Sequence, residues 1–183
     1  PASRPDAVIA LNYDASRGLD AKTRVSGEFI MNGAGAAEMQ GQMASVPADR
    51  LEEGLKSMWE GIVPGVEVDT VDTRYDDEAN SFRFLMTGEV QLAWATAPGG
   101  RSLSIPNSAL ELATSPERKD EFAEWKDAPY AVGHPSYVVA TVSLTLPNGG
   151  EGFRLEGADA VIEAGGHRVE RQTTLNGGVV TMT

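Results

Sequence analysis

The sequence predicts a β-rich α+β domain, in which hairpin-linked strands form an antiparallel sheet or sandwich and one firm helix packs against it. Three observations predict this class. Apolar and polar residues alternate over several segments, one segment after residue 45 has helical periodicity, and glycine pairs separate strand-like runs near the C-terminus. The 183 residues are enough for one substantial core, and we expect residues 1–183 to form a single domain.

Two strands are predicted at the start of the chain. Residues 6–13, DAVIALNY, form the first, and residues 22–32, KTRVSGEFIMN, form the second. In the second run apolar and polar residues alternate, which is typical of a strand with one buried face. The apolar positions are Val25, Phe29 and Met31, and the polar ones are Arg24, Ser26 and Glu28.

The period then changes to that of a helix, which we expect at about residues 47–63. Ser45 is the expected N-cap, and Pro64-Gly65 ends the helix. A weaker, short helix is expected at about residues 36–44, where small residues and Gly41 lower the helical propensity. One apolar stripe of the main helix is formed by Leu51, Leu55, Met58, Trp59 and Ile62.

A long hairpin is predicted after the helix. Residues 66–75 alternate with a change of phase near Thr70, which indicates a β-bulge. A second run follows with a bend or pause expected at Gly88, and the residues DDEAN at 76–80 form the turn between the two strands. The apolar row of this second strand consists of Phe82, Phe84, Met86, Val90, Leu92 and Trp94.

The second half of the chain is less regular before it returns to strands. Between residues 97 and 135 we expect only a short strand at 102–105 and a helical turn at 115–125. A strand is predicted at residues 136–146. Two hairpins follow, with turns at Gly165-Gly166 and Asn176-Gly177.

Composition excludes several function classes. Fifteen basic and 27 acidic residues give a net charge of −12, which disfavours binding to nucleic acid or anionic lipid. No apolar run is long enough for insertion into a membrane. Because the chain has no cysteine, it has no disulfide, no thiolate metal site and no cysteine nucleophile.

The remaining residues show no catalytic or metal-binding motif. The acids of residues 76–80 are adjacent, whereas a calcium loop needs oxygen ligands at alternate positions and a glycine at the sixth. We therefore expect no cofactor, no metal and no enzymatic activity. Trp59 and Trp94 are expected in the core, and the candidate contacts to a partner are Trp125, Tyr130 and His134.

The ends of the chain and two internal segments indicate a piece of a longer protein. The chain starts with PASRPDAVIA and stops inside a strand-like run, VVTMT. The two internal segments are residues 62–90 and 118–149. Their signature is the order of the predicted strands and helices, together with a few fixed residues that have no catalytic chemistry. These residues are Pro64-Gly65, Asp77, Asn80, Pro135 and Leu146-Pro147. From about residue 6 to its end, the chain resembles the region that follows the catalytic core in bacterial transglutaminase-like proteins with an N-terminal DUF3857 domain.

The resemblance implies a function and a location. The family's papain-like Cys-His-Asp core would lie upstream, and none of its catalytic positions falls in this segment. We therefore expect a non-catalytic accessory domain that packs on or orients that core, in the periplasm or cell envelope. The partners would be the upstream catalytic domain of the same polypeptide, another envelope protein or a glycan. The alternative is a carbohydrate- or cell-wall-binding β-module.

Overall fold

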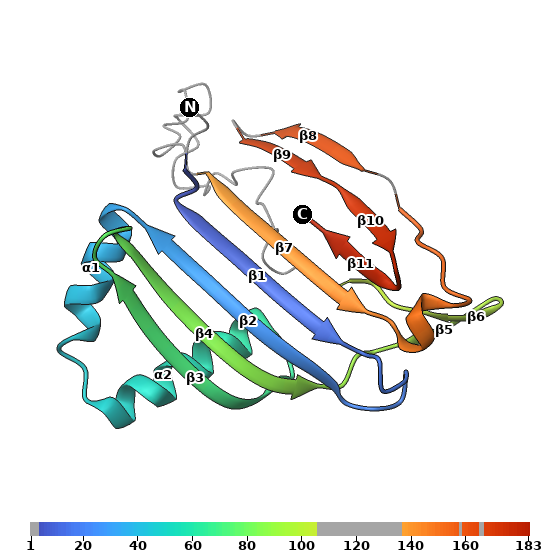
Figure 1. Ribbon diagram of the computed structural model, residues 1–183, viewed down its shortest axis with the longest axis horizontal. Coiled ribbons are helices and arrows are strands. Elements are labelled where there is room, and N and C mark those ends of the chain that lie inside the picture. The colour runs from blue at the N-terminus through green and yellow to red at the C-terminus, as the bar shows by residue number, and fades with distance from the viewer. Residues whose placement is uncertain (1–3, 106–136, 158, 165–166) are drawn as a thin grey trace, which may run out of the picture.

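The computed structural model describes residues 4–105, 137–157, 159–164 and 167–183 (Figure 1). It confirms the β-rich α+β class, because a seven-stranded sheet dominates the molecule. Its strand order is β10-β11-β7-β1-β2-β4-β3. The strands are β1 (Ala7–Asp14), β2 (Thr23–Asn32), β3 (Glu67–Asp76), β4 (Ser81–Val90), β7 (Val138–Thr145), β10 (Thr173–Asn176) and β11 (Val179–Met182). Two small antiparallel sheets pair β5 (Ala95–Ala97) with β6 (Gly100–Ser102), and β8 (Ala160–Ala164) with β9 (His167–Arg171).

The central pair of the large sheet differs from the antiparallel arrangement that the sequence predicts. β1 and β7 run parallel, with Leu11 opposite Val142, whereas the other neighbouring strands are antiparallel. A parallel neighbour requires a long crossover connection. The long stretch between β4 and β7 provides one, and β7 therefore enters the sheet between the first strand and the C-terminal hairpin.

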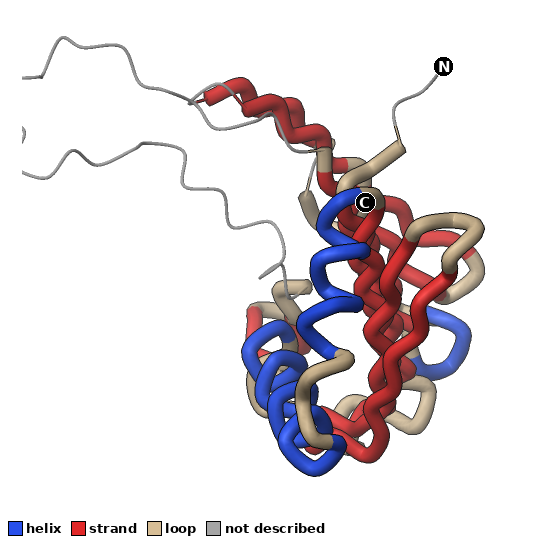
Figure 2. The backbone as a smooth tube through the Cα atoms, turned by 90° about the vertical axis from the view of Figure 1, so that its left-hand side faces the viewer, coloured by secondary structure: helices blue, strands red, loops and turns tan. Residues whose placement is uncertain are grey.

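Two helices cover one side of the sheet over β2, β3 and β4 (Figure 2). The helices are α1 (Ala34–Met43) and α2 (Ala48–Ile62), close to the predicted ranges. Trp59 of α2 is fully buried and lies directly over Gly27 of β2. A Cβ atom on Gly27 would lie 2.5 Å from the indole ring, so only glycine lets the helix approach the sheet this closely.

The predicted N-cap of the main helix is wrong. Pro47 precedes the first residue of α2, and no side chain caps that end. The hydroxyl of Ser45 instead donates to the carbonyl of Gln42, 2.8 Å away. The last turn of α1 leaves carbonyls without partners inside the helix, and the Ser45 amide also donates to the Gln42 carbonyl, at 3.2 Å.

In the described part of the chain, α1 and α2 pack over β2, β3 and β4, and other segments complete the core of the remaining half of the sheet. β1, β7 and β11 turn buried side chains to the same side as α1 and α2: Leu11, Tyr13, Ala140, Val142, Leu144, Val180 and Met182. Half-buried apolar side chains of residues 94–105 and 153–155 pack against this same core, and the rings of Trp94 and Phe153 lie 6.0 Å apart. The helices and residues 94–105 and 153–155 thus share one continuous core.

The hairpin of β3 and β4 confirms the predicted bulge and turn but not the length of β4. The register shifts between Val68 and Thr70, and Gly88 lies opposite this bulge, where a Cβ would be 2.5 Å from the carbonyl oxygen of Glu67. β4 runs from Ser81 to Val90 through Gly88, so of the bend or pause predicted there the pause is wrong. It ends at Val90 rather than Trp94, because β2 and β3 offer no paired residues beyond this point.

The shorter segments agree with the sequence in type and differ in position. In the turn at 76–80, the Asp76 carboxylate accepts the Ala79 amide at 2.8 Å and Asn80 has a φ of 44°. The short strand expected at 102–105 lies at 100–102. Both C-terminal hairpins are present, although the turn between β10 and β11 uses Gly177-Gly178. The predicted helical turn at 115–125 lies outside the described residues.

Candidate functional site: the open face of the sheet

The side of the sheet opposite α1 and α2 forms a broad surface, which we call the open face. Alternate residues of a strand point to opposite sides. Since Gly27 faces Trp59, its neighbours Ser26 and Glu28 in β2 belong to the open face, and the strand pairing extends this assignment across the sheet. The α-helices α1 and α2 lie on the other side, and the short 3-10 helix η3 (Pro147–Gly150) follows the end of β7 (Figure 2).

The open face of β2, β3 and β4 is charged, and we call it the charged half. Arg83 pairs with Glu28 at 3.2 Å, and Arg74 pairs with Asp72 at 3.1 Å. All four side chains are at least one-third exposed. A depression of about 580 Å³ lies here, lined by Glu28, Arg74, Tyr75, Asp76, Asp77, Arg83 and Leu85.

The open face of β1, β7 and β11 has no ionisable side chain before the end of β1 at Asp14. We call it the uncharged half. Its nine residues are small or β-branched, and all except Asn12 are partly shielded by their neighbours. They are Val8, Ala10, Asn12, Val139, Thr141, Ser143, Thr145, Val179 and Thr181.

A row of hydroxyl and amide groups crosses the boundary between the two halves. The row has one residue on each of the neighbouring strands β7, β1, β2, β4 and β3. In that order the residues are Ser143, Asn12, Ser26, Thr87 and Thr70. The hydroxyls of Thr70 and Thr87 are hydrogen-bonded at 2.7 Å. A depression of about 350 Å³ follows this row, with Asn12, Tyr13, Asp14, Arg24, Val25, Ser26, Asp69, Thr87, Gly88, Glu89 and Thr145 as its lining.

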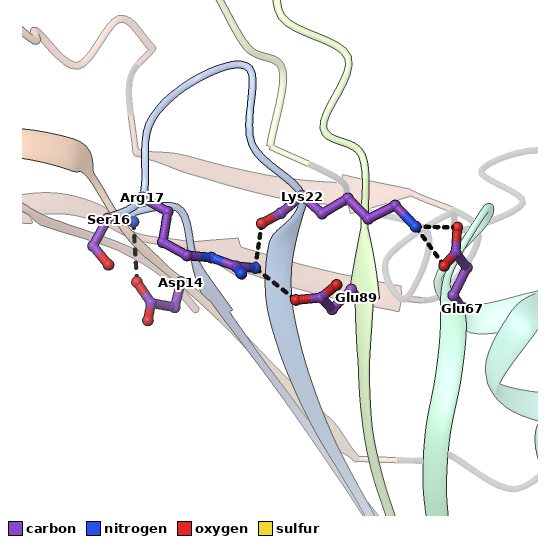
Figure 3. Close-up of polar contacts among 6 residues, drawn as sticks. All are labelled: Asp14, Ser16, Arg17, Lys22, Glu67 and Glu89. Carbon is purple, nitrogen blue, oxygen red and sulfur yellow. Dashed lines mark hydrogen bonds and ion pairs between the residues drawn. The ribbon is translucent and has the colours of Figure 1, made fainter.

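The loop between β1 and β2 fastens one end of the charged half (Figure 3). Arg17 donates to the Glu89 carboxylate at 2.6 Å and to the carbonyl of Lys22. The ammonium of Lys22 donates to both carboxylate oxygens of Glu67. The loop thereby reaches over β2 and links the beginning of β3 to the end of β4.

Electrostatics at this end hold the groups in their charged forms. Hydrogen bonds from Ser16 lower the pKa of Asp14, whose carboxylate accepts the Ser16 amide at 3.0 Å. The hydrogen bond from Arg17 lowers the pKa of Glu89, and the one to Glu67 raises the pKa of Lys22. Each shift moves the group away from neutral pH, so these residues act as fixed charges rather than as proton donors or acceptors.

Aromatic side chains lie on the helix side of the sheet. The strand register places four aromatic residues on the side that faces α1 and α2: Tyr13, Phe29, Phe82 and Phe84. The rings of Phe29 and Phe84 are stacked, with their centroids 5.5 Å apart. Trp59 is in the core as predicted, and Trp94 is half-buried. The three predicted partner contacts, Trp125, Tyr130 and His134, lie outside the described residues.

The described residues were also compared with the requirements of a metal site and of a membrane-spanning helix. Within it, no group of three or more His, Asp or Glu side chains is placed to hold a metal ion. No helix formed by these residues is long and apolar enough to cross a bilayer.

The sequence analysis did not predict that the open face divides into a charged half and an uncharged half. Its signal is present, because residues 138–145 and the first half of β1 contain no charged residue. Recognising it requires the parallel pairing of β1 with β7, which joins segments about 130 residues apart.

Comparison with protein-family models, curated proteins and solved structures finds no match to the chain. The resemblance to transglutaminase-like proteins therefore depends on the order of elements and the residues given above.

Proposed function

We propose that the chain is a non-catalytic interaction domain that packs on another folded unit through its uncharged half. The observation that carries the proposal is the absence of charge over nine neighbouring residues of the open face, in a chain with 15 basic and 27 acidic residues. The centres of protein interfaces are depleted in charged residues in the same way.

The side chains of the uncharged half also suit burial against a flat partner. Ser, Thr and Val lose little rotamer entropy when they are covered, compared with Lys, Glu or Arg. Their hydroxyls can hydrogen-bond across an interface, and no ion has to be desolvated. A sheet or helix laid on this surface would pack about 10 Å from it, as layers do in ordinary domains.

The partner we propose is the catalytic core of a transglutaminase-like protein, encoded upstream in the same polypeptide. This proposal is supported by the sequence resemblance, which also favours the periplasm or cell envelope as the location. The upstream reading frame tests it: a parent without a Cys-His-Asp core would remove this partner but leave the contact surface to be tested with whatever domain precedes the chain.

Titration of the isotope-labelled chain with the upstream segment, followed by NMR, tests the contact surface. We expect the amide signals of Asn12, Thr141 and Ser143 to shift, while those of Glu28 and Arg74 stay in place. Shifts confined to the charged half or to the helices would contradict the proposal. So would the absence of any shift at millimolar concentrations of the segment.

The glycan-binding alternative predicts a different surface. Sugar-binding sheets commonly present aromatic rings, whereas the aromatic residues of the described strands lie on the helix side. Calorimetric titration with cell-wall fragments, using Trp125→Ala and Tyr130→Ala as comparison variants, tests this alternative. Heat that disappears in either variant would favour glycan binding over packing on a protein.

A further inference from the structure

A second surface lies on the small sheet of β8 and β9, which we call the β8–β9 ribbon. Among the described residues β8 pairs with β9 alone, so its other edge is open, and β8 is the outermost strand of its side in Figure 1. Val161 and Ile162 of β8 are 61% and 50% exposed. They are consecutive in the strand and therefore lie on opposite sides of the ribbon.

This arrangement is poorly stable without a third strand. A two-stranded hairpin is marginal in water on its own. Within the residues that the structure describes, the open edge of β8 presents unpaired N–H and C=O groups, and exposed β-branched residues favour pairing with another strand. Neither charge nor proline blocks Ala160, Val161 or Ile162 from such pairing.

We propose that two copies of the chain pair through β8, in antiparallel orientation, with Ile162 opposite Ile162 of the second copy. Within one chain Ile162 lies opposite Val169 of β9. The pairing would therefore create a four-stranded sheet with a continuous apolar row on one side, formed by Val169 and Ile162 of each copy. A two-fold axis generates this row from a single surface, as in most homodimers.

The charges of the ribbon are compatible with this register. Val161 would lie opposite Glu163 of the second copy, and each Glu163 already accepts a hydrogen bond from Arg168 of its own chain at 2.9 Å. Arg168 also pairs with Glu170 at 2.6 Å. Residues 160–171 contain two acids and two arginines, a net charge of zero in a chain of −12, so the two ribbons do not repel each other.

Engineered cysteines test the register, because the natural chain has no cysteine. In Ile162→Cys the two thiols would face each other across the axis at a Cα separation of about 4.5–5.5 Å, which a disulfide can bridge. In Val161→Cys the two thiols would lie about 8 Å apart on a diagonal, too far for a bridge. We expect mild oxidation to give a covalent dimer at least about tenfold faster for Ile162→Cys than for Val161→Cys. Equal rates would overturn the proposal.

Sedimentation velocity over a concentration series tests the association itself. We expect the natural chain to dimerise reversibly and Ile162→Lys, which places two lysines opposite each other, to weaken the dimer about tenfold or more. Val161→Lys places its lysine opposite Glu163 of the second copy and should change the dissociation constant less than about threefold. A monomer at all concentrations, or a dimer insensitive to Ile162→Lys, would overturn the proposal. Circular dichroism checks that both variants keep the fold.

Discussion

The half of the sheet formed by β2, β3 and β4 is covered by helices on one side and carries ion pairs on the other. The half formed by β1, β7 and β11 lies beside the part of the sheet that α1 and α2 cover, and its open face has no charged side chain before Asp14 at the end of β1. In the charged half, Arg74 pairs with Asp72 and Arg83 with Glu28, and such exposed pairs suit contact with water. The uncharged half shares with the centres of protein interfaces its lack of charged residues. The two halves therefore differ in their surroundings, although they belong to one sheet.

The largest difference between the halves should appear when their covering tryptophans are removed. Trp59→Ala leaves a cavity between α2 and the sheet and should lower the free energy of unfolding by about 3–5 kcal/mol. Trp94→Ala removes a half-buried ring from the irregular cover and should cost about half as much. Chemical denaturation of both variants measures the difference. Equal losses would mean that helices and irregular segments contribute equally to the core.

The next largest expected effect is a loss of folding stability at alkaline pH, caused by the buried hydroxyl of Tyr13. This side chain lies on the core side of β1, beneath the uncharged half. Burial raises the pKa of Tyr13 to about 12. The unfolded chain loses this proton near pH 10, whereas the folded chain keeps it, so stability falls as the pH rises from 10 to 12, by about 2 kcal/mol. Tyr13→Phe should lack this part of the alkaline loss.

At neutral pH the same variant should change stability by less than about 1 kcal/mol, because the hydroxyl has no hydrogen-bond partner among the described residues. Tyr75→Phe is the matched control, since the Tyr75 hydroxyl donates to Asn80 at 3.0 Å. Loss of the Tyr75 hydroxyl should cost about 1 kcal/mol at pH 7. Denaturation curves at pH 7 and pH 11 compare the two; an alkaline loss in Tyr13→Phe as steep as in the natural chain would contradict the assignment.

Glycine substitutions test the close contact of helix and sheet in the charged half. Gly27→Ala should destabilise the fold by about 1–3 kcal/mol, because the new methyl group meets the ring of Trp59. Gly54→Ala, within α2, meets no atom within 4 Å. It should stabilise the helix by up to about 1 kcal/mol. Melting temperatures that move in the same direction for both would show that the packing of α2 on β2 is looser than described.

The smallest effect concerns the exposed ion pair between Arg17 and Glu89. The pKa of Glu89 is lowered in the folded chain, so the contribution of this pair is present at neutral pH and is lost as the pH falls through that lowered value. Glu89→Gln should therefore melt slightly below the natural chain at pH 7 and together with it in acid. A difference that persists at low pH, or that is insensitive to salt at pH 7, would point to packing rather than charge.

Local patterns in the sequence predicted the parts of the fold that depend on neighbouring residues. The apolar stripe of α2, the bulge near Thr70 and the turn at residues 76–80 follow from side-chain periodicity and turn chemistry. The end of β4 at Val90 could not be predicted in this way, because apolar alternation continues to Trp94 while the neighbouring strands stop.

Tertiary contacts determined the remaining differences. Ser45 caps the end of α1 because of where two helices meet, and β1 lies beside β7 because of a long crossover. Predicting the open face requires both the strand order of the sheet and the side that the helices cover. Its charge pattern is visible in the sequence only after these are fixed.

Two serines in the same cross-strand row allow the most direct measurement of the proposed contact surface. Ser143 belongs to the uncharged half, and Ser26 lies two strands away in the charged half, about 10 Å distant. We expect Ser143→Lys to weaken binding of the upstream segment about tenfold or more, and Ser26→Lys to change it less than about threefold. Equal effects of the two lysines, or a larger effect at Ser26, would contradict the assignment of the uncharged half as the contact surface.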